Sequence, residues 1–235
     1  MPWSIMAASS VRSGEPLNSV DSPKFGSPQL QRSTINEIHS SEQSGVPLNT
    51  SWTFWLDKSV PGTSVAEYET TLRKLYTVST VQGFWSVYNN IPDVSKLNVR
   101  YTYHLMRNEL IQHCRQHRNM MVVREDEFNC RGGNWRLKCH KFDTPVVWKE
   151  LLLAAIGEQL TEYMAEDDNI GGVSVSVRER DDIVQIWNTR SDLHEESNVI
   201  DKIRELVPDV NFTAIFYKGI THQAFEGKSG SPAKR

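Results

Sequence analysis

The sequence lacks any long apolar run and any recognisable targeting segment. No stretch of its 235 residues approaches the roughly 20 apolar residues that a membrane-spanning helix needs. The N-terminus does not carry the basic and then apolar segments of a secretory signal. We therefore expect an intracellular, cytoplasmic protein that does not enter a membrane.

Cysteine is also scarce, and the chain has no excess of positive charge. Three cysteines, an odd number without framework spacing, fit a reducing compartment better than a disulfide scaffold. The formal net charge of −3 argues against a broad basic face that would grip long nucleic acid irrespective of sequence. A small anionic ligand is compatible with this charge. Tryptophan, in contrast, is abundant: seven are present in this length.

Composition divides the chain into three regions. Residues 1–45 are rich in Ser, Pro, Gly, Asn and Gln, and have too few clustered apolar residues to offset the entropy lost on folding. We expect them to form a disordered N-terminal tail. Residues 46–218 have the size and composition of one globular domain, which we expect to be a monomer, and residues 219–235 read as a flexible C-terminal tail.

Hydrophobic periodicity predicts an α+β fold. Predicted strands cover residues 52–57, 72–78, 101–105, 135–139, 173–180, 183–187 and 212–217. Predicted helices cover residues 80–91, 148–160 and 194–207. Strands outnumber helices and hairpins dominate, so we expect antiparallel strands with the helices on one face.

The helix at residues 80–91 has two apolar sides. Thr80 is suited to cap its N-terminus, and Pro92 ends it. One apolar stripe consists of Phe84, Val87, Tyr88 and Ile91. Trp85 lies to the side of this stripe, with Val81 one turn before it. The pair either offers a groove to a partner or simply widens the side of the helix that faces the core.

Two further elements combine a core side with a polar side. In the helix at residues 148–160, the core stripe is Trp148, Leu151, Leu152 and Ala155, while Glu150 and Leu153 lie on another side. In the strand that begins at residue 173, valines alternate with polar residues. Ser174, Ser176, Arg178 and Arg180 therefore share the face opposite the valines.

The order of the motifs resembles the eukaryotic translation initiation factor 4E family. The matching motifs are Trp52-x-x-Trp55, TVxxFWxxYNNI, RGGxW, WxxxLLxxIGE and SVRxRxDxxxxW, which run from about residue 46 to residue 217. The sequences around these motifs are most similar to the type 3 branch of the family. The resemblance implies a curved antiparallel eight-stranded sheet with three helices on its convex face. It also implies a protein that binds the 7-methylguanosine cap of messenger RNA in translation initiation or its regulation, as in the 4F complex.

The resemblance assigns cap binding to Tyr68, Glu125, Arg178, Arg180 and Trp187. Tyr68 takes one of the two aromatic positions that sandwich the cationic base, Glu125 accepts its N–H groups, and Trp187 contacts its methyl group. Arg178 and Arg180 take the phosphates.

The chain departs from the family pattern at two positions of this site. Arg124 stands where the second sandwich tryptophan is expected, at the end of an atypical loop over residues 110–124 that is about ten residues too long. Ile183 stands at a third basic position. The alternative is therefore a protein of the same fold that holds partners and binds the cap weakly or not at all.

The resemblance also implies a partner site. Pro47, Val81, Trp85, Glu150 and Leu153 match positions that receive a helical motif containing tyrosine and leucine. Proteins with this motif are the scaffold factor 4G and the 4E-binding regulators. Lys149 stands at a neighbouring position where the family usually has an apolar residue. We expect this difference to affect the choice of partner.

Metal binding and enzymatic chemistry are not expected. A set of cysteines and histidines, namely His113, Cys114, His117, Cys130, Cys139 and His140, has spacings that match no standard zinc pattern. The acidic residues at 125–127 and 166–168 are explained as solvated charge. We therefore expect a binding protein with no cofactor.

Overall fold

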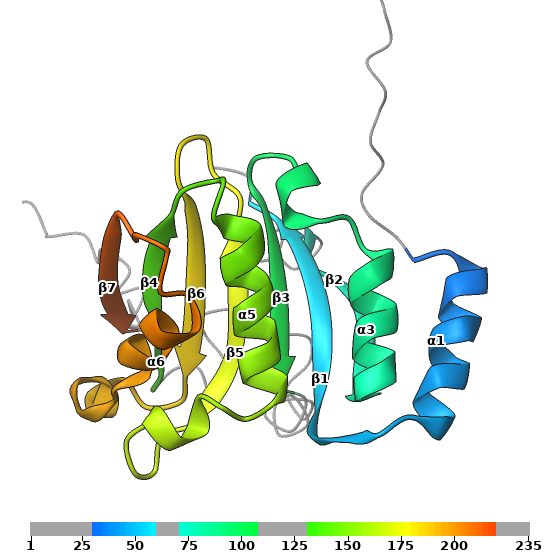
Figure 1. Cartoon of the computed structure of the whole chain (residues 1–235), viewed down its shortest axis with the longest axis horizontal. Coiled ribbons are helices and arrows are strands. Elements are labelled where there is room, and N and C mark those ends of the chain that lie inside the picture. The colour runs from blue at the N-terminus through cyan, green and yellow to red at the C-terminus, as the bar shows by residue number, and fades with distance from the viewer. Residues whose placement is uncertain (1–29, 60–70, 108–130, 220–235) are drawn as a thin grey trace, which may run out of the picture.

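The computed structural model describes residues 30–59, 71–107 and 131–219 (Figure 1). Its centre is a seven-stranded antiparallel sheet in the order β2-β1-β3-β5-β6-β4-β7. The strands are β1 (Pro47–Lys58), β2 (Arg73–Thr80), β3 (Tyr101–Arg107), β4 (Gly133–Cys139), β5 (Ile170–Ser176), β6 (Asp182–Asn188) and β7 (Ala214–Gly219). The predicted α+β class with antiparallel strands is confirmed. The described residues contain seven strands, where the family resemblance implied eight.

The helices gather on one side of this sheet. They are α1 (Arg32–Ser44), α3 (Val81–Asn90), α5 (Thr144–Ile156) and α6 (Val199–Leu206). Figure 1 shows α3, α5 and α6 on the same face of the sheet and α1 beside α3. No helix in the described ranges is long and apolar enough to span a membrane.

Two predicted helices have different bounds in the structure. α5 begins four residues before Trp148, because Pro145 fits the first turn of a helix, and it ends at Ile156 rather than at residue 160. The helix predicted over residues 194–207 is α6, which begins only at Val199. A separate 3-10 turn, Ser191–Glu196, precedes it.

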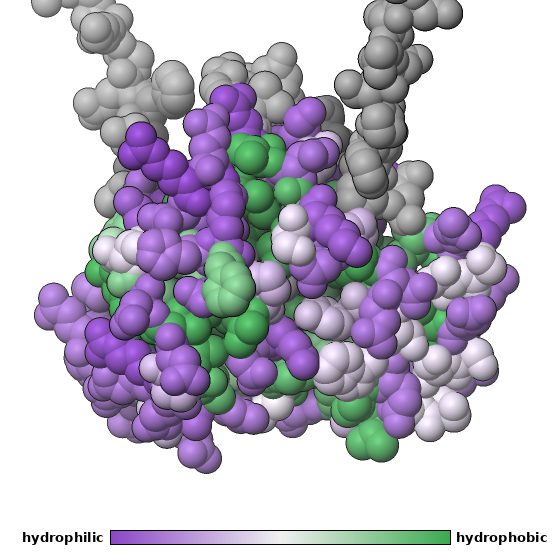
Figure 2. Space-filling view, turned by 45° about the horizontal axis from the view of Figure 1, so that its top comes forward, coloured by the Kyte–Doolittle hydropathy of each residue, from purple (hydrophilic) through white to green (hydrophobic). Residues whose placement is uncertain are grey.

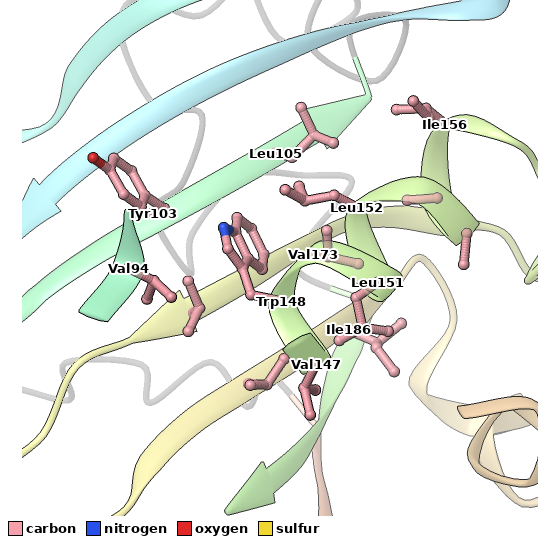
Figure 3. Close-up of a cluster of buried hydrophobic side chains, with 14 of the residues drawn as sticks. Val94, Tyr103, Leu105, Val147, Trp148, Leu151, Leu152, Ile156, Val173 and Ile186 are labelled. Carbon is pink, nitrogen blue, oxygen red and sulfur yellow. The ribbon is translucent and has the colours of Figure 1, made fainter. Parts of the chain in front are cut away.

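α5 forms the centre of the core. Its predicted stripe of Trp148, Leu151, Leu152 and Ala155 is buried. Figure 3 shows Trp148 and Leu152 directed at Leu105 and Val173 of the sheet. Burial of one such side chain stabilises the fold by about 1.5–3 kcal/mol, so this stripe anchors the helix to β3 and β5.

The strands of the sheet separate an apolar face from a polar one. Val173 and Val175 belong to the core under α5, whereas Ser174 and Ser176 point to the opposite face. We call this opposite face the polar face. Its buried polar residues on β1, β3, β5 and β6 are Thr53, Asp57, Thr102, His104, Ser174, Ser176 and Gln185.

α3 begins and ends where the sequence predicts. The Thr80 hydroxyl accepts a hydrogen bond from the Gly83 N–H at 3.0 Å, which satisfies a donor that has no partner within the helix. The helix ends at Asn90, two residues before Pro92. Phe84 and Val87 are buried beneath it.

α1 corrects the prediction that residues 1–45 are a disordered tail. Residues 32–44 form a helix that packs beside α3, with Ile38 fully buried. The Glu42 carboxylate accepts hydrogen bonds from the Ser79 N–H (2.9 Å), the Ser79 hydroxyl and the Thr80 hydroxyl (3.1 Å). A Cβ at Gly83 would overlap this carboxylate, so the glycine leaves room for the Glu42 side chain between α1 and α3. One buried isoleucine and one carboxylate at the start of α3 thus fix a segment whose own composition is typical of disorder.

Candidate functional site

Trp187 lies on the polar face in β6 and is half-buried. Its indole Nε1–H donates to the Ser174 hydroxyl of β5 at 2.8 Å. The Ser174 oxygen also lies 2.8 Å from Nδ1 of His104 in β3, and His104 Nε2 lies 3.3 Å from a carboxylate oxygen of Asp57 in β1. A chain of four polar groups therefore crosses four neighbouring strands and ends at the indole.

The donors and acceptors of this chain have one consistent assignment for neutral His104. An indole N–H can only donate, so the Ser174 oxygen accepts from Trp187. The Ser174 hydrogen then goes to His104 Nδ1, and the remaining N–H of the imidazole, on Nε2, donates to Asp57. The indole N–H, the Ser174 hydroxyl and both imidazole nitrogens are then paired, and the indole of Trp187 is held in one orientation.

Sequence analysis did not assign a role to Ser174, His104 or Asp57. The alternating pattern did place Ser174 on the face of Arg178, and His104 stands in an equally alternating strand. What the sequence does not contain is the register, which sets His104 opposite Ser174 and next to β1.

Arg178 lies just beyond β5, in a connection that a buried carboxylate holds in place. Asp182 accepts hydrogen bonds from the Arg178 backbone N–H and from Lys141 Nζ, both at 2.9 Å, and from the Thr144 hydroxyl at 3.0 Å. Lys141 Nζ also donates to the Arg178 carbonyl. The backbone that carries Arg178 is thus tied to the start of α5.

The side chains of Arg178 and Arg180 are available to an anion. The Nε of Arg178 is buried and has no hydrogen-bond partner among the described residues. Arg180 is exposed. A buried, charged donor without a partner is costly, and an oxyanion is the group that would satisfy it.

The two ends of this site lie far apart. Trp187 is five residues from Asp182 along β6, which corresponds to about 16 Å. A ligand that contacts both Trp187 and Arg178 must therefore be elongated, with an anionic part at the Arg178 end. Two predicted cap residues, Tyr68 and Glu125, and the replacement Arg124 lie outside the described residues.

Cys139 and His140 have partners within the fold. Burial raises the pKa of the Cys139 thiol to about 11, and its Sγ lies 3.5 Å from the His140 carbonyl oxygen. His140 Nδ1 lies 3.2 Å from a carboxylate oxygen of Asp181. The part of the chain that the structure describes contains no group of three or more metal-ligating side chains. His113, Cys114, His117 and Cys130 lie outside it.

The predicted partner residues lie on the helix side. Trp85 is half-buried and meets Phe84 and Tyr88 edge to face, with ring centroids 5.3 and 5.7 Å apart. It therefore widens the core face and also reaches the surface. Pro47 is exposed and pairs with Thr80 at the start of α3, beside the half-buried Val81.

α5 carries the other two predicted partner residues, Glu150 and Leu153. Burial raises the pKa of Tyr88 on α3, and the carboxylates of Asp93 and of Glu150 on α5 add to the increase. Glu150 and Leu153 are both half-buried. In Figure 2, which shows the helix side with its top turned forward, apolar side chains reach the surface between polar ones.

Comparison with known proteins identifies the family. The family described as eukaryotic initiation factor 4E matches residues 47–234. The chain is 33% identical over 153 residues to "Eukaryotic translation initiation factor 4E-1" of Triticum aestivum and 31% identical over 149 residues to "Eukaryotic translation initiation factor NCBP" of Arabidopsis thaliana. These matches cover 65% and 63% of this chain, and they span 64% and 61% of the length of those relatives, which is less than two thirds.

Solved structures with the same fold include eIF4E-3 proteins. C. elegans eIF4E-3, in complex with the 4E-binding protein Mextli and a cap analog, superposes with a TM-score of 0.60 at 26% identity, covering 74% of this chain and 92% of that one. Ascaris suum eIF4E-3 with an m7G cap gives 0.59 at 28% identity, covering 81% and 99%. The resemblance predicted from the motifs is confirmed, and this chain belongs to the eukaryotic initiation factor 4E family.

Proposed function

We propose that this protein binds the 7-methylguanosine cap of messenger RNA on its polar face and a helical partner motif on its helix side. The observation that carries the proposal is the pairing of a fixed indole, Trp187, with the unpartnered buried Nε of Arg178. This pairing suits an elongated ligand with a flat ring at one end and phosphates at the other.

The chemistry of the cap fits these positions. The methylated guanine is a cationic ring, so Tyr68 stacks on it by cation–π attraction and Trp187 contacts its methyl group. Glu125 accepts both N–H groups of the guanine edge. Arg178 and Arg180 take the triphosphate, because a guanidinium matches planar oxyanions. No bond is broken, and the protein acts in the cytoplasm in translation initiation or its regulation.

The helix side supports binding of a 4G-type scaffold or a 4E-binding regulator. A C. elegans relative forms a complex with the 4E-binding protein Mextli. In this chain, Val81 and Trp85 offer apolar surface on α3, and Glu150 and Leu153 add a carboxylate and an aliphatic group on α5. A helix that presents leucine and aromatic side chains is the partner that such a surface fits.

The cap assignment is tested by titrating 7-methyl-GTP and following tryptophan fluorescence. Glu125→Ala should weaken binding by about 1–3 kcal/mol, because the guanine edge loses water without gaining its acceptor. Glu127→Ala, two residues away, is the matched control and should bind as the wild type does. Equal affinity of the Glu125 variant and the wild type would show that this carboxylate does not select guanine.

Arg124 favours a second candidate function, a 4E-like interaction protein with weak or absent cap binding. A cation in place of the second aromatic ring opposes a cationic base and forfeits roughly 1–3 kcal/mol of stacking. Removing most of residues 110–123 together with Arg124→Trp should therefore raise the affinity for 7-methyl-GTP. If the repaired protein binds no better, the loop and Arg124 do not limit cap binding.

A further inference from the structure

The polar face carries a second set of ligand-binding groups along β4 and β7. The nine positions that β6, β4 and β7 place on this face include three cations, two aromatic residues and no carboxylate. They are Ile183, Gln185, Trp187, Asn134, Arg136, Lys138, Ala214, Phe216 and Lys218. In a chain whose net charge is −3, this region has the opposite sign. Its charge is complementary to a polyanion.

Strand register fixes how these groups follow one another. Lys138 is directly opposite Ile183, so β4 supplies a cation beside the basic position that β6 lacks. Arg136 is opposite Phe216. Residues paired in this way lie about 5 Å apart at Cβ. Cations therefore continue from the connection that carries Arg178, over β4, to the edge strand β7.

Arg136 is held in one orientation by the fold, and Phe216 is exposed to solvent. Arg136 Nε donates to the Asn134 side chain at 2.7 Å, and Gln185 donates to the same oxygen at 3.1 Å, so a buried amide fixes the start of the guanidinium. Phe216 is 41% exposed and is the only exposed aromatic residue of the sheet in the described ranges. Lys218, two residues along β7 on the same face, is exposed as well.

A flat apolar ring between cations is the arrangement that binds single-stranded nucleic acid. Bases stack on aromatic side chains irrespective of sequence, and basic side chains follow the phosphates. We propose that Arg136, Lys138, Phe216 and Lys218, which we call the β4–β7 track, bind the first nucleotides that follow the cap in messenger RNA. Phe216 stacks on a base, and the three cations contact the phosphates. This inference rests on the proposed cap binding, since the cap phosphates at Arg178 would direct the RNA chain onto Lys138.

The test compares three probes on the full chain: 7-methyl-GTP, a capped RNA of five nucleotides, and the same RNA with an uncapped 5′-triphosphate. The wild type should bind the capped RNA more tightly than 7-methyl-GTP. Phe216→Ala should lower the affinity for the capped RNA about fivefold or more and leave the affinity for 7-methyl-GTP unchanged. Phe216→Trp should restore the affinity for the capped RNA. Lys138→Ala should weaken the RNA and reduce the slope of log affinity against log salt concentration by about 0.7.

Two exposed residues outside the sheet serve as matched controls. Phe142 is 92% exposed before α5, and Lys96 is exposed in the 3-10 turn Val94–Lys96. Phe142→Ala and Lys96→Ala should leave all three affinities unchanged. Melting curves of each variant exclude a general loss of folding.

The first three of the following outcomes overturn the inference, and the fourth separates it from the cap proposal. Equal binding of capped RNA by the wild type and the Phe216 and Lys138 variants would show that RNA does not follow this track. Equal weakening of 7-methyl-GTP and RNA would place these residues at the cap itself. If no RNA binds but polyglutamate does, and Phe216→Ala abolishes that binding, the surface takes an acidic protein instead. If 7-methyl-GTP fails to bind while the uncapped RNA depends on Phe216, the cap proposal fails and the track remains.

Discussion

Replacing Ser174 with alanine removes the link that orients Trp187. The Ser174 hydroxyl is fully buried and serves two partners, the Trp187 indole and the His104 imidazole, each at 2.8 Å. A buried polar group without its partner costs about 1–3 kcal/mol, so the loss of both contacts should total about 2–6 kcal/mol. For a protein of this size, that lowers the melting temperature by roughly 4–24 °C.

Ser176 provides a matched control in the same strand and on the same face. It is also buried, but within the described residues its hydroxyl bonds only to the Thr102 hydroxyl, at 2.9 Å. Ser176→Ala should therefore cost about 1 kcal/mol and leave Trp187 undisturbed.

The assay combines melting curves with the indole N–H resonance of Trp187, assigned by its absence in Trp187→Phe. Ser174→Ala should shift this resonance and speed its exchange with solvent, whereas Ser174→Thr, which keeps a hydroxyl, should retain much of the wild-type signal. If Ser174→Ala and Ser176→Ala melt alike and the indole resonance stays in place, the series of hydrogen bonds from Asp57 to Trp187 does not orient the indole ring.

Three further predictions concern the helix side and the ion pair at the end of β3. Trp85→Ala should lower the affinity for a 4G-type peptide by about thirtyfold, measured by calorimetry. The reason is that a buried tryptophan anchor often contributes about 2 kcal/mol to binding. A melting curve separates this effect from unfolding, and normal binding by a folded variant would assign Trp85 to the core alone. Gly83→Ala should stabilise the protein by up to about 1 kcal/mol in a Glu42→Ala background but clearly less in the wild type, because the new methyl group displaces Glu42. Additive effects would show that Glu42 does not hold α1 against α3. Glu158 loses water on burial, yet its hydrogen bonds to Arg107 (2.8 and 2.6 Å) hold its pKa below the ordinary value of 4.5. Its stabilising effect should therefore be present above pH 4.5 and lost as the pH falls through the lowered pKa, and in Arg107→Ala this acid-dependent part should be absent from urea unfolding curves.

Local signals were sufficient for much of the fold. The Thr80 cap, the stripe of α5 and the alternation around Val173 each depend on residues that are close in the sequence, and each is confirmed. α1 was missed because its stability comes from Ser79 and Thr80, nearly forty residues away, to which Glu42 bonds.

The candidate site was only partly predictable for a similar reason. The alternating pattern placed Trp187 on the right strand, and the structure finds it on the polar face. Arg178 was predicted inside a strand over residues 173–180, but it lies just beyond β5, which ends at Ser176. The roles of His104 and Ser174 depend on which residues pair across β3 and β5, and a single sequence does not contain that register. Whether Tyr68 and Glu125 complete the site stays a prediction.

The two-sided character of β5 has a consequence for how this protein can change over time. Its serines serve the polar face and its valines serve the core, one residue apart along a single strand. A substitution at Ser174 can therefore change the polar face without repacking the helices. A shift of the strand by one residue would instead turn its valines toward the polar face and its serines toward α5. Gains and losses of residues should thus be tolerated between the strands of this sheet, whereas the strands themselves can only exchange one side chain for another.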